Sequence, residues 1–304
     1  MKKSIILVLL VMFLLVSAFG AQKGPVTVAS KIDTEGALLG QMIVLMLRDS
    51  GFEVTDKTEF GTTPIIRQSI IAGEIDIYPE YTGNGGFFFD NIDPIIWKNG
   101  ELGYEVVKYL DREKNGLVWL KPASANNTWA ISTRKDLAEK ENIYTLENFA
   151  EYVNEGGKVK LACSEEFVNR EDALPAFQNA YGFTLKDNQL LTFSGGNTAQ
   201  TERAAALGTD GVNFAMAYGT DGALSSLGLI VLEDTKNVQP VYRPAPLVRE
   251  EIYLNYPEIG EILKPVFESL SLETLQTLNA KIAIQGLPAS EVASDYLKEN
   301  GFLK

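Results

Sequence analysis

Short apolar and β-branched runs alternate with helix-length segments along most of this chain, and this alternation limits the folds that it can adopt. The first unit comprises an apolar run at 26–30, a helical pattern whose candidate N-cap is Thr34, and a second run at 52–55. A helical pattern at 64–72 and a run at 75–78 follow. Strand–helix–strand units at this spacing are typical of a mostly parallel sheet covered by helices. The pattern therefore predicts an α/β fold.

The middle of the chain repeats this arrangement, and its end is helical. Further strands are expected near 128–132, 159–163, 189–193 and 212–217, with helices near 170–181 and 198–207. From about Pro257 the apolar residues follow helical spacing, with one face formed by Leu263, Val266, Phe267 and Leu270. A chain of 304 residues has room for about two domains, yet no linker dense in Pro or Gly separates them. We therefore expect two α/β lobes joined by chain crossings near 124–127 and 234–240.

The first twenty residues form a segment of their own. Lys2 and Lys3 precede an apolar run at 5–16, and small residues follow it. A short basic start, an apolar stretch and a small-residue exit are features of a secretory signal peptide. A membrane anchor is the alternative, but this run is well short of the roughly 20 apolar residues that cross a bilayer as a helix. We predict a signal peptide at 1–20, cleaved after Ala18 or Gly20, and a periplasmic mature protein that is free in solution.

Composition excludes several classes of function. The chain has 27 Lys and Arg against 40 Asp and Glu, and its net charge of −13 argues against nucleic acid and anionic membranes as partners. It has no histidine, which excludes Ser-His-Asp and Cys-His catalysis and histidine-bound zinc. Its single cysteine, Cys163, excludes an intramolecular disulfide and a thiolate zinc cluster. We expect no metal and no cofactor.

Carboxylate pairs are a remaining enzymatic option. Asp76 and Glu80 lie close together in the sequence. A longer acidic run contains Glu165, Glu166, Glu171 and Asp172. A catalytic pair requires two environments that separate the pKa values of its members, and solvated acids on loops and helix starts are the simpler interpretation. The glycine-rich stretch 83–86 lacks the lysine and spacing of a phosphate-binding loop, so we interpret it as a tight turn. The stretch 195–198 could bind an anion, but a helix N-cap is the simpler interpretation.

Aromatic residues lie where a small-molecule site is expected. Tyr78 and Tyr81 lie at the carboxyl end of a predicted strand and in its loop, where open α/β sheets bind ligands. Trp129 lies at the first crossing, Tyr218 ends a predicted strand, and Tyr242 lies near the second crossing. Each of these residues could belong to the core. Their shared position at strand ends and crossings favours a ligand site.

Several short motifs resemble those of one family. They are Lys31 with Thr34-Glu35, the run 73–83 that ends in Tyr-Pro-Glu-Tyr-Thr-Gly, Asn-Asn-Thr-Trp-Ala at 126–130, Arg170-Glu171-Asp172, and Ala-Tyr-Gly-Thr-Asp at 217–221. In this order they resemble the quaternary-amine-binding proteins of ABC importers for glycine betaine, choline, carnitine and similar osmoprotectants. The resemblance covers essentially the whole mature chain, and Tyr-Pro-Glu-Tyr-Thr-Gly is its specific motif.

The resemblance implies a site of eight residues. An aromatic box would surround a trimethylammonium head, with the members Tyr81, Trp129, Tyr218 and Tyr242. A ligand carboxylate would be held by Lys31, Arg170 and the turn residue Asn84, and Asn127 is part of the same ligand-binding set. The chain departs from the family pattern at Asn84, which is usually Thr, at Trp129, which is commonly Tyr, and at Gly36, which is usually Gln. Aromatic faces suit a trimethylammonium group because it donates no strong hydrogen bond, and each face contributes about 0.5–2 kcal/mol.

The resemblance also implies a type II periplasmic-binding-protein fold with a ligand cleft between two α/β lobes. Lobe 1 would comprise 21–126 and 238–304, and lobe 2 would comprise 127–237. The expected function is capture of a quaternary ammonium osmoprotectant, with glycine betaine preferred, by a monomer that delivers it to a membrane permease and catalyses no reaction.

Two alternatives remain open. One is a binding protein for choline or another small solute; Lys31 and Arg170 discriminate here, because both pointing into the cleft would favour a ligand carboxylate. The other is an exported hydrolase such as a glycosidase. Its mark would be two convergent carboxylates about 5–9 Å apart in place of an aromatic cage.

Overall fold

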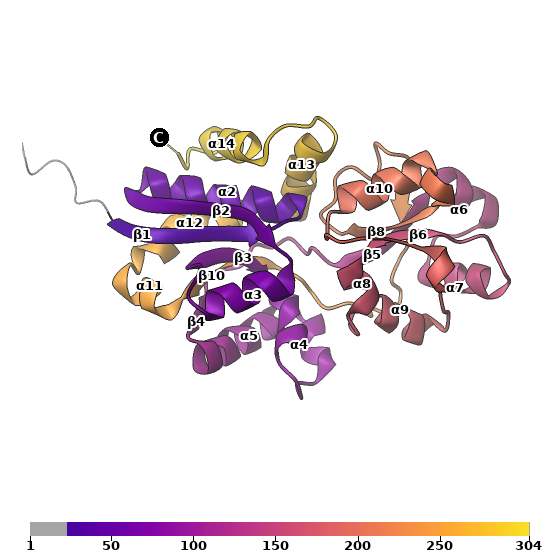
Figure 1. Ribbon diagram of the computed structural model, residues 1–304, viewed down its shortest axis with the longest axis horizontal. Coiled ribbons are helices and arrows are strands. Elements are labelled where there is room, and N and C mark those ends of the chain that lie inside the picture. The colour runs from indigo at the N-terminus through magenta and orange to yellow at the C-terminus, as the bar shows by residue number, and fades with distance from the viewer. Residues whose placement is uncertain (1–22, 304) are drawn as a thin grey trace, which may run out of the picture.

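The computed structural model describes residues 23–303, so the predicted signal peptide at 1–20 lies outside the described residues. Within this range the chain forms two lobes that lie side by side, each built on a five-stranded sheet (Figure 1). No helix in this range is long and apolar enough to cross a membrane.

The sheet of the first lobe has the strand order β2-β1-β3-β10-β4. β1 is parallel to β2 and β3, whereas β10 is antiparallel to β3 and β4. The strands are β1 (Lys23–Lys31), β2 (Phe52–Gly61), β3 (Ile77–Tyr81), β4 (Leu117–Trp119) and β10 (Pro244–Arg249).

Helices cover both faces of this sheet (Figure 1). α2 packs against β1 and β2 on one face, with α12, α13 and α14 against α2, while α3 packs on the other face and α5 packs beside β4. The helices of this lobe are α2 (Thr34–Asp49), α3 (Thr63–Ile71), α4 (Gly85–Phe88), α5 (Gly100–Asn115), α11 (Glu250–Asn255), α12 (Glu258–Ser269), α13 (Leu272–Ala283) and α14 (Ala289–Glu299).

The second lobe repeats the strand plan of the first. Its sheet has the order β7-β6-β8-β5-β9, with β6 parallel to β7 and β8, and β5 antiparallel to β8 and β9. The strands are β5 (Trp129–Arg134), β6 (Leu161–Ser164), β7 (Leu190–Phe193), β8 (Phe214–Tyr218) and β9 (Leu229–Val231). The helices are α6 (Lys135–Glu141), α7 (Leu146–Asn154), α8 (Glu165–Asn169), α9 (Leu174–Tyr181) and α10 (Thr198–Leu207).

The core explains why the first βα unit forms. Leu38, Leu39, Met42 and Ile43 of α2 are fully buried. Complete burial of such a side chain stabilises the fold by about 1.5–3 kcal/mol, so this one helix contributes much of the first core. The helix ends before Gly51, whose φ of 85° lies in the left-handed region that glycine adopts without strain.

The prediction of a mostly parallel sheet is wrong, because half of the strand pairings in each sheet are antiparallel. The antiparallel strands are β5 and β10, and each enters its sheet directly after the chain has crossed from the other lobe. Such a strand does not follow a βα crossover within its own sheet, so the rule that makes βαβ units parallel does not apply to it.

Two predicted helix starts are also corrected. The N-cap of α2 is Asp33, whose side chain accepts a hydrogen bond from Gly36 N, and Thr34 is the first helical residue. The helix predicted at 170–181 begins later, because residues 170–173 connect α8, which ends at Asn169, to α9, which begins at Leu174. Pro175 lies in the first turn of α9, the position at which a helix tolerates proline.

Other predicted elements are confirmed. The helix at 198–207 is α10 with Asn197 as its N-cap, and the apolar face near the end of the chain is buried. The chain passes between the sheets at 120–128 and at 232–243, the segments between β4 and β5 and between β9 and β10. The predicted crossings fall in these segments.

Candidate functional site

The two lobes meet around a cavity of about 50 Å³. All eight residues that the sequence analysis proposes line it, namely Lys31, Tyr81, Asn84, Asn127, Trp129, Arg170, Tyr218 and Tyr242. Both lobes and both crossings contribute to this set, so folding brings together residues that are far apart in the chain. Their contact with a ligand stays a prediction.

Strand ends position these residues. Tyr81 is the last residue of β3 and Tyr218 is the last of β8, and these strands hold the third place in their respective sheets. Lys31 ends β1, Trp129 begins β5, and Tyr242 lies two residues before β10. Because the lobes share one strand plan, the ends of equivalent strands meet at the cavity, where ligands bind in open α/β sheets.

Trp129 lies at the centre of the aromatic cluster. Its ring centre is 6.3 Å from that of Tyr218, with the planes 22° apart, and 5.7 Å from that of Tyr242 in an edge-on arrangement. Trp129 Nε1 and the Tyr242 hydroxyl are buried and have no hydrogen-bond partner among residues 23–303. Buried donors normally have a partner, so a ligand group that accepts hydrogen bonds would suit this position.

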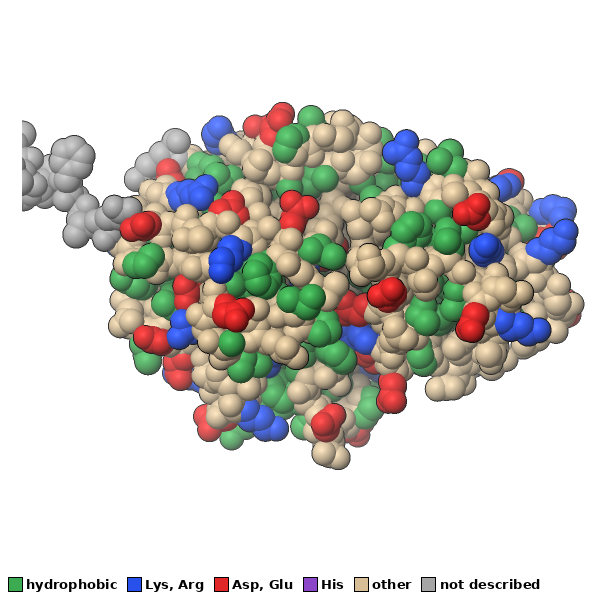
Figure 2. All heavy atoms as spheres, in the orientation of Figure 1, with side chains coloured by type: hydrophobic (Ala, Val, Ile, Leu, Met, Phe, Trp, Pro, Cys, Tyr) green, Lys and Arg blue, Asp and Glu red, His purple; other side chains and the backbone are tan. Residues whose placement is uncertain are grey.

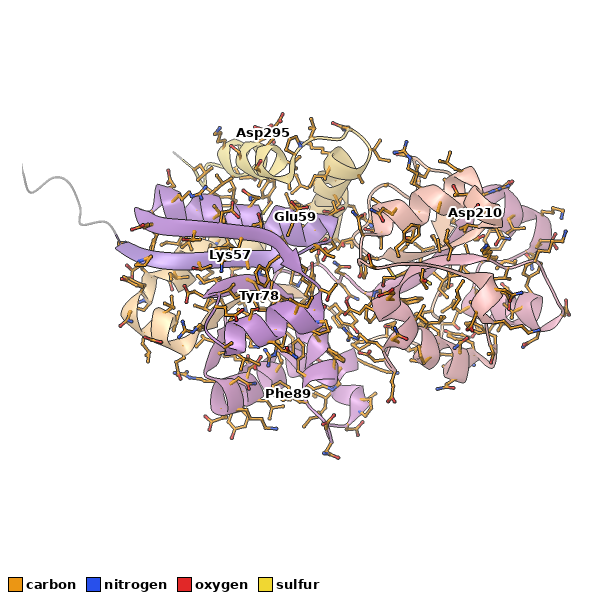
Figure 3. All side chains as sticks on the ribbon, in the orientation of Figure 1. Lys57, Glu59, Tyr78, Phe89, Asp210 and Asp295 are labelled. Carbon is orange, nitrogen blue, oxygen red and sulfur yellow. The ribbon has the colours of Figure 1, made fainter. Side chains whose placement is uncertain are left out.

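Lys31 is held from within the first lobe. Its Nζ lies 2.6 Å from Glu80 Oε1 and 4.7 Å from the centre of the Tyr81 ring. Glu80 is fully buried and also accepts hydrogen bonds from the Tyr78 hydroxyl at 2.9 Å, Tyr81 N at 2.7 Å and Asn84 Nδ2 at 2.7 Å. Figure 3 labels Tyr78 within this lobe. The positive charge of Lys31 is therefore balanced inside the protein.

Arg170 joins the two lobes. Its guanidinium donates to the carboxylate of Asp172 at 2.9 and 2.7 Å and to Glu166 Oε1 at 3.0 Å. Nη1 also donates to Asn84 Oδ1 in the first lobe at 2.9 Å, and Cζ lies 4.6 Å from the centre of the Trp129 ring. Burial acts to lower the pKa of Arg170, but the hydrogen bonds and charge of Asp172 outweigh burial and raise it. This residue stays cationic in the closed cleft.

A buried carboxyl group lies behind each of two cavity tyrosines. Glu35 Oε1 accepts hydrogen bonds from the Tyr81 hydroxyl at 3.0 Å and Asn127 Nδ2 at 2.8 Å, and burial raises the pKa of Glu35 to about 7. In the second lobe, Asp221 Oδ2 accepts from Tyr218 N at 2.5 Å, and burial raises the pKa of Asp221 as well. These bonds fix the Tyr81 hydroxyl and the backbone of Tyr218.

Two charged residues that line the cavity, Asp33 and Glu166, are not among the eight predicted site residues. Interpreting the acidic run as solvated is wrong for Glu166 and Asp172, because both carboxylates bind Arg170. Asp33 was missed because the cap of α2 was assigned to Thr34. An aspartate between a strand that ends in a cavity residue and the following helix is the signal that could have identified it.

A wider groove of about 880 Å³ opens between the lobes beside the cavity. Its lining includes the acidic residues Asp90, Glu165, Glu166, Glu171 and Asp172. Figure 2 shows acidic and basic side chains gathered where the lobes meet. An acidic groove attracts cations and raises their local concentration. Among the residues that the structure describes, no group of three His, Cys, Asp or Glu side chains is placed to hold a metal ion.

Comparisons with known proteins agree with this geometry. Residues 24–299 match a family described as the substrate binding domain of ABC-type glycine betaine transport systems. The chain is 54% identical over 295 residues to the glycine betaine-binding protein YehZ of Escherichia coli (strain K12), with 97% of each chain covered. It is 32% identical to a glycine-betaine-binding protein of Pseudomonas aeruginosa over 93% of this chain and 90% of that protein.

Solved structures show the same fold. Apo YehZ from E. coli superposes with a TM-score of 0.67 at 55% identity, covering 92% of this chain and 100% of that chain. Lactococcal OpuAC, in its closed conformation with glycine betaine, superposes with a TM-score of 0.63 at 13% identity, covering 93% and 100%. The predicted fold, two α/β lobes of the periplasmic-binding-protein type, is therefore confirmed. This chain belongs to the family of substrate-binding domains of ABC-type glycine betaine transport systems.

Proposed function

We propose that this protein captures a quaternary ammonium osmoprotectant, with glycine betaine as the preferred ligand, and delivers it to an ABC permease in the membrane. The observation that carries the proposal is the convergence of four aromatic side chains from both lobes and crossings on one cavity, namely Tyr81, Trp129, Tyr218 and Tyr242. Membership of the glycine betaine transport family supports it.

The chemistry of the cavity fits this ligand class. A trimethylammonium head donates no strong hydrogen bond and is attracted to ring faces, each of which contributes about 0.5–2 kcal/mol. Lys31 and Arg170 line the same cavity and supply positive charge near a carboxylate tail. The buried Trp129 Nε1 and the Tyr242 hydroxyl, which lack protein partners in the described range, are donors for the same tail.

Closure of two lobes around the ligand is the signal that the permease would receive. In this proposal the lobes are 21–126 with 238–304, and 127–237, and the protein acts as a monomer in the periplasm after loss of its signal peptide. It makes and breaks no bond. Glu166 is engaged by Arg170, which leaves Asp33 alone on the cavity wall and disfavours the carboxylate pair of a glycosidase.

Choline is the second candidate ligand, and one observation favours it. Lys31 and Arg170 both line the cavity, but each already forms an ion pair with a protein carboxylate, Glu80 or Asp172. Because protein carboxylates already balance the charges of Lys31 and Arg170, choline, which has no carboxylate, can bind without leaving either charge unbalanced.

A calorimetric titration of the ligand-free mature protein with glycine betaine, choline, carnitine and proline betaine tests the proposal. We expect the tightest binding for glycine betaine. Tighter binding of choline would support the second candidate, and no heat of binding with any of the four would contradict the proposed function.

A further inference from the structure

The charged side chains that line the cavity differ in how they are compensated. Lys31 is paired with Glu80, and Arg170 is paired with both Glu166 and Asp172. Asp33 also lines the cavity, yet it forms no ion pair within residues 23–303. The charge of Lys31 lowers the pKa of Asp33, but Lys31 is already paired with Glu80. A carboxylate without an ion-pair partner of its own is unfavourable in such a site unless a ligand supplies the missing charge.

The backbone fixes Asp33 at the edge of the first lobe. Its Oδ1 accepts a hydrogen bond from Gly36 N at 2.8 Å, which holds the side chain over the first turn of α2. A Cβ atom at position 36 would lie 2.9 Å from Lys31 O and 3.1 Å from Asp33 Oδ2, so the glycine makes room for this carboxylate.

The second lobe covers this turn. A Cβ atom at Gly195 would lie 3.0 Å from Ile32 Cδ1, so the loop before α10 lies directly against the residue that precedes Asp33. Asp33 is partly buried in this position, and burial raises its pKa, although the hydrogen bond from Gly36 N and the charge of Lys31 act to lower it.

The charge of Asp33 acts on tyrosines of both lobes. Burial raises the pKa of Tyr81 well above its usual value, and the charges of Glu35 and Asp33 raise it further. Burial likewise raises the pKa of Tyr218, and Asp33 is the next largest cause. A charge that acts on both rings lies close to the space that they enclose.

We propose that Asp33 is the counter-ion for the positively charged head of the ligand, so that the site selects charge through a carboxylate as well as through ring faces. This inference rests on the proposed function and makes it more specific. A quaternary head between the rings compensates Asp33, whereas a neutral head of the same shape leaves the carboxylate unpaired. The ligands that gain from Asp33 are cations and zwitterions that present a quaternary ammonium group.

The alternative is that Asp33 serves only as the N-cap of α2, and one substitution separates the two roles. Asparagine caps helices as well as aspartate does, so Asp33→Asn removes the charge while it keeps the shape and the cap. Asp93→Asn is the matched control. Asp93 accepts a hydrogen bond from Ile95 N at the start of the 3₁₀ turn Pro94–Lys98, and it is exposed and outside the cavity.

The test measures the affinity of the wild type and both variants for four probes by calorimetry. Two probes are charged at the head, glycine betaine and choline, and two are their neutral carbon analogues, 3,3-dimethylbutanoate and 3,3-dimethyl-1-butanol. Asp33→Asn should weaken both charged probes about tenfold or more and should leave the neutral probes unchanged or bound more tightly. Asp93→Asn should change none of them.

Two results would overturn the inference. Unchanged affinity of Asp33→Asn for the charged probes would leave Asp33 as a cap alone, and equal weakening of charged and neutral probes would make its role one of packing. If the wild type binds choline but not glycine betaine, the preferred ligand proposed above is wrong, and choline with its neutral analogue still decides the role of Asp33. If the wild type binds neither charged probe, both proposals fail.

Discussion

The two lobes share one strand plan, yet they hold their cationic cavity residues in different ways. In the first lobe, Lys31 is bound by Glu80, whose side chain is fully buried and whose other hydrogen-bond donors all come from the same lobe. In the second lobe, Arg170 is bound by Glu166 and Asp172, whose side chains are 18% and 27% exposed.

The hydrogen bond from Arg170 to Asn84 is a second difference between the lobes, because it joins them and exists only while they are together. Phe87 of the first lobe adds to it, since its ring centre lies 4.2 Å from Arg170 Cζ. The first wall of the cavity, where Glu80 holds Lys31, is therefore formed by one lobe alone. The second wall, where Glu166 and Asp172 hold Arg170, depends in part on closure of the lobes. Damage to the first wall should reduce stability, and damage to the second should reduce ligand affinity.

The largest effect is expected from Glu80→Ala. Removal of one partner from a buried ion pair leaves the other charge uncompensated, which costs about 3–5 kcal/mol. Glu166→Ala should lower the free energy of unfolding by less than about 1 kcal/mol, because its pair is partly solvated and Arg170 retains Asp172. Denaturant unfolding of the ligand-free variants measures both. Glu80→Gln, which keeps the size of the side chain, serves if the alanine variant does not fold, and equal losses at positions 80 and 166 would remove the distinction between the walls.

The second prediction concerns pH and the carboxyl group behind Tyr81. The pKa of Glu35 is raised by burial from 4.5 to about 7, so between these values the folded protein binds more protons than the unfolded chain. The stabilising contribution is present below pH 4.5 and is lost as pH rises through 7, with a total of about 3 kcal/mol at 1.36 kcal/mol per pH unit. Glu35→Gln should flatten the pH dependence of the free energy of unfolding in this window. Identical slopes for the variant and the wild type would contradict the assignment.

The third prediction concerns the second wall. Arg170→Ala should weaken glycine betaine about 10- to 100-fold, because a hydrogen bond to a charged group contributes about 1.5–3 kcal/mol. Choline should be weakened less, since it has no carboxylate, and calorimetry with both ligands measures the difference. Asn84→Ala removes the same inter-lobe bond, together with the bond from Asn84 Nδ2 to Glu80, and keeps the charge of Arg170. If Asn84→Ala weakens both ligands as much as Arg170→Ala weakens glycine betaine, Arg170 acts through closure and not through the ligand carboxylate.

More of the site residues could be predicted from the sequence than of the hydrogen bonds and ion pairs that hold them in place. Strand ends and crossings could be predicted from apolar runs and motifs, and they place Tyr81, Trp129 and Tyr218 at one cavity without knowledge of any side-chain contact. Asp33 was not assigned as the N-cap, because Asp33 and Thr34 are both good N-cap residues and the backbone geometry decides between them. Its place just after the strand that ends in Lys31 was the signal that pointed to it. The partners of Arg170 depend on how the two lobes meet, which no local pattern records.

The smallest effect is expected at Trp129, which begins β5 directly after the first crossing and so belongs to the junction of the two walls. Trp129→Phe keeps an aromatic face but a weaker one, and it removes the buried Nε1 donor. The preference for glycine betaine over 3,3-dimethylbutanoate should fall about 2- to 10-fold, as expected from part of a cation–π contribution of about 0.5–2 kcal/mol.

The matched control for Trp129→Phe is Phe167→Leu. The Phe167 ring packs edge-on against Trp129 with centres 5.8 Å apart, is fully buried and does not line the cavity. This change should lower stability and leave the preference between the two ligands unaltered. If Phe167→Leu alters the preference as much as Trp129→Phe does, the Trp129 ring acts through packing at the junction of the two walls. Trp129 then belongs neither to a wall that supports the fold nor to a wall that selects the ligand.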